Sequence, residues 1–83
     1  MIPNNVLLGL QKEVQDMSVG DNTPNDVAKH VAKELLPYID QKQGDLFGQC
    51  VRLVRRYCLQ LGCHETTTRS ELIKLVRDKY DIS

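Results

Sequence analysis

The side chains of this sequence that could bind a metal ion are Cys58, Cys63 and His64, which lie close together in the chain. Zinc sites usually draw on cysteines paired as C-x-x-C, and no such pair occurs here. On a continuous helix Cys58 and Cys63 would point about 140° apart, so they would not present two thiolates to one ion. Folding could bring His30 near, but its position on the polar side of a helical pattern is typical of a solvated imidazole. We predict no metal site and no cofactor.

Catalysis by a nucleophile requires a base within hydrogen-bond reach, and the side chains of sequence neighbours such as Cys63 and His64 normally diverge. Carboxylates at helical spacing, which could act as general acid and base, occur on polar faces only: Glu13 with Asp16, and Asp78 with Asp81. The sequence contains no glycine-rich phosphate loop. A short, mainly aliphatic chain also has little room for a pocket of about 300 Å³ or more. We therefore expect neither enzymatic activity nor a small-molecule substrate.

Basic side chains give the stronger functional signal. Arg52, Arg55 and Arg56 share one side of a helical pattern, and Leu59 projects among them as the one apolar residue outside the apolar arc. Four further basic residues follow: Arg69, Lys74, Arg77 and Lys79. Three interpretations stay open for this basic face: a solvated surface neutralised by acidic residues within one molecule or across a dimer, a nucleic-acid contact, or an interface for an acidic partner protein.

The charge balance bears on these interpretations. Eleven basic and eleven acidic residues give a formal net charge of zero, which argues against strong nonspecific binding to polyanions. Up to Gln41 there are three basic and six acidic residues, whereas from Lys42 onward there are eight basic and five acidic ones. We expect a dipolar molecule with an acidic first half and a basic second half.

Length and composition predict one domain over residues 1–83. A chain of 83 residues, 41% apolar and 27% charged, can fold but buries only a thin core, so we expect dimerisation to supplement it. No apolar run approaches the roughly 18 residues of a membrane span. Three cysteines, an odd number, without a signal-peptide pattern predict a reducing, cytoplasmic setting and no membrane contact.

The first half of the chain shows two helical patterns. Apolar residues at spacings of three and four predict a first helix over residues 2–18, capped by Asn4 or Asn5. Gly9 inside it marks either the close approach of another helix or a weak point. After the breaker at residues 19–22, Thr23 and Pro24 predict the start of a second helix, and Pro37 predicts a kink near its end.

Residues 45–62 form the longest apolar helical pattern, with Asp45 as the expected cap and Gly62 as the expected stop. One arc of this helix is apolar, and it predicts burial of Leu46, Phe47, Cys50, Val51, Leu53, Val54, Tyr57, Cys58 and Leu61. The opposite side carries the three arginines with Gln49 and Gln60. We expect this third helix to lie at the centre of the fold, with Leu59 exposed.

The last helix is predicted to begin at a capping box. Residues 63–67 read as a loop, and Thr68 to Glu71 match the pattern in which the two side chains satisfy each other's free backbone donors. The inner stripe of this helix is expected to be Leu72, Ile73, Val76 and Tyr80. No alternation with period two, typical of strands, occurs in the sequence.

The segment from Leu61 to Ile73, with -LG- followed by TTRSELI, resembles the passage between the two helices of ribbon-helix-helix repressors. Members of that family pair through a strand directly before their first helix, whereas residues 41–44 (QKQG) have no strand pattern and the 63–67 loop is longer. The capping box accounts for the same residues. The sequence therefore does not predict membership of that family.

The sequence as a whole predicts an all-α domain of four short helices packed around the third, at about residues 45–62, with a dimer as the expected assembly. We expect a small protein–protein interaction or regulatory module whose contact surface is Arg52, Arg55, Arg56 and Leu59, for a partner protein or for self-association. The alternative is a nucleic-acid-binding regulator that uses the basic face together with Arg69, Lys74, Arg77 and Lys79.

Overall fold

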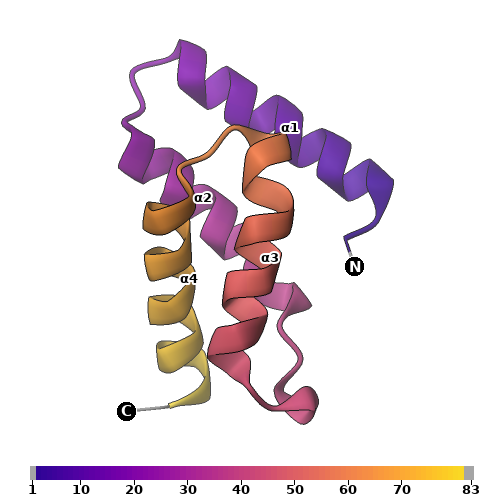
Figure 1. Cartoon of the computed structure of the whole chain (residues 1–83). Helices are drawn as coiled ribbons and strands as arrows, with labels where there is room; N and C mark the ends of the chain where they lie inside the picture. The colour runs from indigo at the N-terminus through magenta and orange to yellow at the C-terminus, as the bar shows by residue number, and fades with distance from the viewer. Residues whose placement is uncertain (1, 82–83) are drawn as a thin grey trace.

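The protein is a bundle of four α-helices in a computed structural model that describes residues 2–81 (Figure 1). The helices are α1 (Asn4–Val19), α2 (Pro24–Leu35), α3 (Leu46–Leu61) and α4 (Glu65–Tyr80), with 3₁₀ turns at Leu36–Tyr38 and Gln41–Gln43 between α2 and α3. No strand occurs among residues 2–81, so the predicted all-α class is confirmed. None of the helices in this range is both long and apolar enough to cross a membrane.

The helices α2, α3 and α4 pack against one another, and α1 lies across one end of them (Figure 1). The α3 and α4 helices lie side by side, and α1 crosses the end of the bundle at which they join. The most extensive helix contact is between α2 and α4, followed by that between α3 and α4, so the expected central position of the third helix is not confirmed. Ala28 and Ala32 on α2 are fully buried, and their small side chains allow a neighbouring helix to approach closely.

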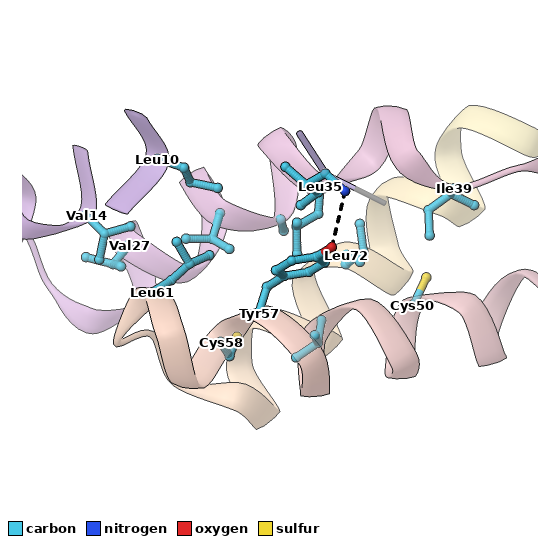
Figure 2. Packing of buried hydrophobic residues seen from close by; sticks show 14 of the residues in the cluster. Leu10, Val14, Val27, Leu35, Ile39, Cys50, Tyr57, Cys58, Leu61 and Leu72 are labelled. Carbon is cyan, nitrogen blue, oxygen red and sulfur yellow. Dashed lines mark hydrogen bonds between the residues drawn. The ribbon is translucent and has the colours of Figure 1, made fainter. Parts of the chain in front are cut away.

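The core contains most of the apolar arc predicted for α3. Cys50, Val54, Tyr57, Cys58 and Leu61 are buried, and they meet apolar residues of the other helices such as Leu10, Val14, Val31, Leu35 and Leu72 (Figure 2). The Ile2 backbone N–H donates to the Tyr57 hydroxyl at 3.2 Å, which ties the start of the chain to α3 and satisfies a buried phenol.

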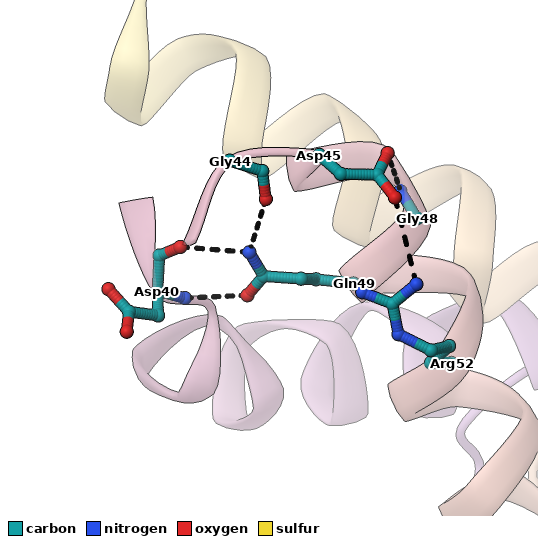
Figure 3. Close-up of polar contacts among 6 residues, drawn as sticks. All are labelled: Asp40, Gly44, Asp45, Gly48, Gln49 and Arg52. Atoms are coloured by element: carbon teal, nitrogen blue, oxygen red, sulfur yellow. Dashed lines mark hydrogen bonds and ion pairs between the residues drawn. The ribbon is translucent and has the colours of Figure 1, made fainter. Parts of the chain in front are cut away.

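Two predictions for α3 are wrong at its first turns. Phe47 was expected in the core but is 36% exposed, and the guanidinium of Arg77 on α4 lies 5.5 Å from the centre of its ring. Gln49 was expected outside but is buried. Its side chain joins three backbone groups: it accepts from Asp40 N at 2.8 Å, donates to Asp40 O at 2.8 Å and donates to Gly44 O at 2.7 Å (Figure 3).

Local sequence chemistry fixes both ends of α3, as predicted. Asp45 has a left-handed backbone (φ 46°), and its carboxylate accepts from Gly48 N at 3.3 Å. A side chain at position 48 would force the Asp45 carboxylate to move, so glycine at this position favours the cap. Gly62 ends the helix with φ 74°, a conformation that glycine adopts without strain.

Of the predictions for the other helix ends, some are correct and some are wrong. Thr23 caps α2 with Pro24 in the first turn, as expected, and the chain changes to a 3₁₀ turn at Leu36, next to Pro37. The expected caps of α1 are wrong, since Pro3 precedes the helix and no side chain caps it. Gly9 has no atom within 4 Å of an added Cβ, so it is a weak point rather than a place of close approach.

The predicted start of α4 is also wrong: the helix begins about one turn before Thr68. His64 is the cap, and its Nδ1 accepts from Thr67 N at 3.3 Å. Thr68 does not act as a cap: its side chain is fully buried, and its hydroxyl donates to His64 O at 2.7 Å. Because this bond satisfies the hydroxyl inside the helix, Thr68 can face the core and the helix begins earlier than the capping-box pattern indicates.

Candidate interaction surface

The outer side of α3 carries the four residues that the sequence singled out. Arg52, Arg55, Arg56 and Leu59 are all exposed, and their spacing of i, i+3, i+4 and i+7 places them in one line along the helix. We refer to these four residues as the α3 stripe. Leu59 is 91% exposed, the highest value among the large apolar residues of residues 2–81. Folding therefore buries almost none of the apolar surface of the Leu59 side chain.

The arginines of the α3 stripe have weak ties to the rest of the molecule. Arg52 Nη1 lies 3.6 Å from Asp45 Oδ2, and both side chains are mostly exposed (Figure 3). The Arg56 guanidinium lies 5.7 Å from the centre of the Tyr57 ring. Arg55 takes part in none of the ion pairs found within residues 2–81. An exposed ion pair of this kind contributes little, about 0 to 1 kcal/mol, so a partner could displace it.

Two hollows flank the α3 stripe. One, of about 460 Å³, lies between α1 and the end of α3, and its lining residues are Gln11, Val14, Gln15, Ser18, Leu59, Gln60, Leu61 and Gly62. The other, of about 400 Å³, is lined by Tyr38, Asp40, Gln43, Gln49, Arg52, Leu53, Arg56 and Tyr57. Sequence reasoning missed the residues of α1 and Tyr38, because only packing between helices brings them beside the stripe.

Three of the four basic residues predicted on α4 have weak intramolecular contacts of the same kind as those of Arg52 and Arg56. Lys74 pairs with Glu71 at 3.5 Å. The charged groups of Arg77 and Lys79 lie over the rings of Phe47 and Tyr80, at 5.5 and 5.4 Å from their centres. Arg69 is half-buried. Three of the four therefore already have an intramolecular neighbour.

The described residues also hold one cluster that the sequence did not indicate. His30, expected to be solvated, is half-buried, and its Nε2 lies 2.6 Å from Glu13 Oε2 across the α1–α2 contact. Glu34 completes a group whose potential ligand atoms all lie within 4.8 Å of one another. Because both carboxylates are exposed, we interpret this group as a polar contact that holds α1 against α2 rather than as a metal site.

The thiols differ from expectation in one respect. Cys50 and Cys58 are buried, whereas Cys63 is partly accessible. The expected divergence of Cys58 and Cys63 is wrong, because α3 ends at Leu61 and the left-handed Gly62 turns the chain back over the last turn of the helix. Cys63 Sγ consequently lies 3.9 Å from the Cys58 carbonyl oxygen.

Comparison with family models, curated proteins and solved structures finds no match to this chain. The functional assignment therefore depends on the chemistry and geometry of the residues themselves.

Proposed function

We propose that this protein is a noncatalytic interaction or regulatory module that binds an acidic helical segment of a partner protein on the α3 stripe. The observation that carries the proposal is the 91% exposure of Leu59 within a line of three arginines. Burying a leucine fully in an interface contributes roughly 1.5 to 3 kcal/mol. That free energy is available to a partner because folding does not use it.

The composition of the α3 stripe suits a small protein interface. Such interfaces combine an apolar centre with a polar rim, and arginine is enriched in them. A guanidinium binds a carboxylate through two parallel hydrogen bonds, which gives direction as well as affinity. The i, i+3, i+4, i+7 spacing keeps the four side chains in one line that a partner helix can follow, and the two flanking hollows offer room for the partner's side chains.

An acidic protein segment fits these residues better than a nucleic acid. Nucleic-acid affinity depends on many phosphate contacts, and the formal net charge of this chain is zero. A protein segment would also bury the exposed Leu59 side chain, whereas phosphate groups would not. The cytoplasm is the location we propose, because the cysteines are free thiols, as expected in a reducing compartment.

A photo-crosslinking experiment tests this proposal. A benzophenone amino acid replaces Leu59 in one variant and Leu8, 66% exposed on α1, in a control variant. After irradiation in an extract of the native source, mass spectrometry identifies the crosslinked segments. We expect position 59, and not position 8, to crosslink to an acidic helical segment of another protein.

Three results would contradict the proposal. Crosslinks from position 59 to nucleic acid would support the alternative regulator that contacts DNA or RNA through its basic face. Crosslinks to a second copy of this chain would make the stripe a dimer contact. Equal crosslinking from positions 59 and 8 would remove any special role for Leu59.

A further inference from the structure

Two thiols five residues apart meet at the end of α3. The turn at Gly62 lets the Cys63 backbone N–H donate to the Cys58 carbonyl at 3.2 Å, and Cys63 Sγ lies 3.9 Å from the same oxygen. Residues in these two positions around a left-handed helix end commonly touch, because the backbone bond holds them together.

The two thiols differ in access. Cys58 faces the core and is almost fully buried (Figure 2). Cys63 is half-buried and lines a hollow of about 210 Å³ whose other lining residues are Ser18, Asn22, Pro24, Val27, Gly62 and His64. A molecule as small as hydrogen peroxide can therefore reach Cys63, while Cys58 lies behind it.

The proximity of the two thiols also separates their acidities. It lowers the pKa of Cys63 to about 7 against the opposing effect of burial, with further help from Thr68, and it raises the pKa of Cys58 together with burial and the nearby Glu65. The lowered pKa makes Cys63 a thiolate more often at pH 7 than a thiol with the ordinary pKa of 9.0. Burial raises the pKa of the remote Cys50 to about 11.

We propose that Cys63 and Cys58 form a peroxide-reactive redox site, in which Cys63 is the attacking thiolate and Cys58 is the resolving thiol of an intramolecular disulfide. An accessible thiolate beside a second thiol is the arrangement that favours reversible oxidation over irreversible damage. This inference is independent of the proposed partner binding.

The reaction balances with hydrogen peroxide as the oxidant. The Cys63 thiolate attacks one peroxide oxygen, the O–O bond breaks, and Cys63 becomes a sulfenic acid while hydroxide leaves. Hydroxide takes the Cys58 proton to give water. The Cys58 thiolate then attacks the Cys63 sulfur, an S–S bond forms, and a second hydroxide leaves and takes up from solvent the proton that Cys63 released when it ionised, which gives a second water. Two thiols lose two electrons and one peroxide gains them.

The test treats the full chain with hydrogen peroxide at pH 7 and measures mass and thiol content. We expect the protein to become two hydrogen atoms lighter and its reactive thiols to fall from three to one. Trypsin cleavage after Arg56 and Arg69 leaves Cys58 and Cys63 in one peptide, residues 57–69, which should carry the mass loss and recover it with a thiol reductant.

Three variants complete the test. Cys50→Ala should form the disulfide at the rate of the natural chain, and Cys63→Ser should lose it while keeping helical circular dichroism. Cys58→Ala should accumulate a Cys63 sulfenic acid that dimedone traps. Should the buried Cys58 substitution unfold the chain, the peptide map of the natural chain and of Cys63→Ser still decides. Oxidation of Cys50 as fast as Cys63, three persisting thiols, or disulfide-linked dimers in place of the internal disulfide would overturn the proposal.

Discussion

Leu59 and Leu61 lie two residues apart in the last turn of α3 and have opposite environments. Leu61 is 5% exposed and packs in the core, as Figure 2 shows, whereas Leu59 is 91% exposed beside the arginines of the α3 stripe. The difference separates two roles within one helix. The inner side of α3 stabilises the fold, and the outer side has a composition that folding does not require.

The largest effect on stability is expected from the inner member of this pair. Leu61→Ala should lower the free energy of unfolding by about 2 to 4 kcal/mol, because it removes buried methyl groups and leaves a cavity. Leu59→Ala should change it by about 0.5 kcal/mol or less. Urea unfolding followed by circular dichroism measures both, and equal losses for the two variants would show that the two sides of α3 do not differ as described.

The turn that follows the pair gives a smaller effect. Gly62→Ala should lower the free energy of unfolding by about 1 to 2 kcal/mol, because alanine is strained at φ 74°. No atom lies within 4 Å of an added Cβ, so the loss would come from the backbone alone. Gly62→Asn is the matched control, since asparagine tolerates this conformation and should recover part of the loss. An unchanged midpoint for the alanine variant would contradict the left-handed helix end.

A substitution at Gly9 on α1 should raise the stability of the protein instead of lowering it. Gly9→Ala should raise the free energy of unfolding by about 1 kcal/mol, because alanine favours the helix and Gly9 has open space around it. The same denaturation experiment measures this gain. A loss of stability would mean that another segment approaches α1 at this point.

The smallest effect is expected from the exposed pair between α1 and α2. Glu13→Gln should lower the free energy of unfolding by about 0.3 to 1 kcal/mol, since the His30 contact is only partly shielded from water. The paired variant His30→Gln allows a double-mutant cycle, in which a coupling free energy near zero would rule out a stabilising contact.

Helix ends could be predicted wherever a single residue's own chemistry decides them. Asp45, Gly62 and Thr23 act within one turn of themselves, and the structure confirms all three. The start of α4 could not be predicted, because it depends on the burial of Thr68 against other helices. The burial of Gln49 likewise requires backbone groups of Asp40 and Gly44 that only the folded connection presents.

The candidate surface also has a part that the sequence predicted and a part that depends on the fold. The periodicity of one helix was enough to place Leu59 and the three arginines on its outer side. The two flanking hollows need residues of α1 and Tyr38, which are remote in sequence. The contact between Cys58 and Cys63 was missed because helical periodicity was extended past Leu61, where the left-handed turn reverses the chain.

The most direct test of the central claim is the affinity of the crosslinked partner segment for two aspartate variants, measured by isothermal titration calorimetry. Leu59→Asp should weaken binding about 30-fold or more, the effect of losing a contact worth about 2 kcal/mol, while Leu8→Asp stays within about twofold of the natural chain. Both variants should keep their helical circular dichroism. Unchanged affinity for Leu59→Asp would contradict the claim that the outer side of α3 binds the partner.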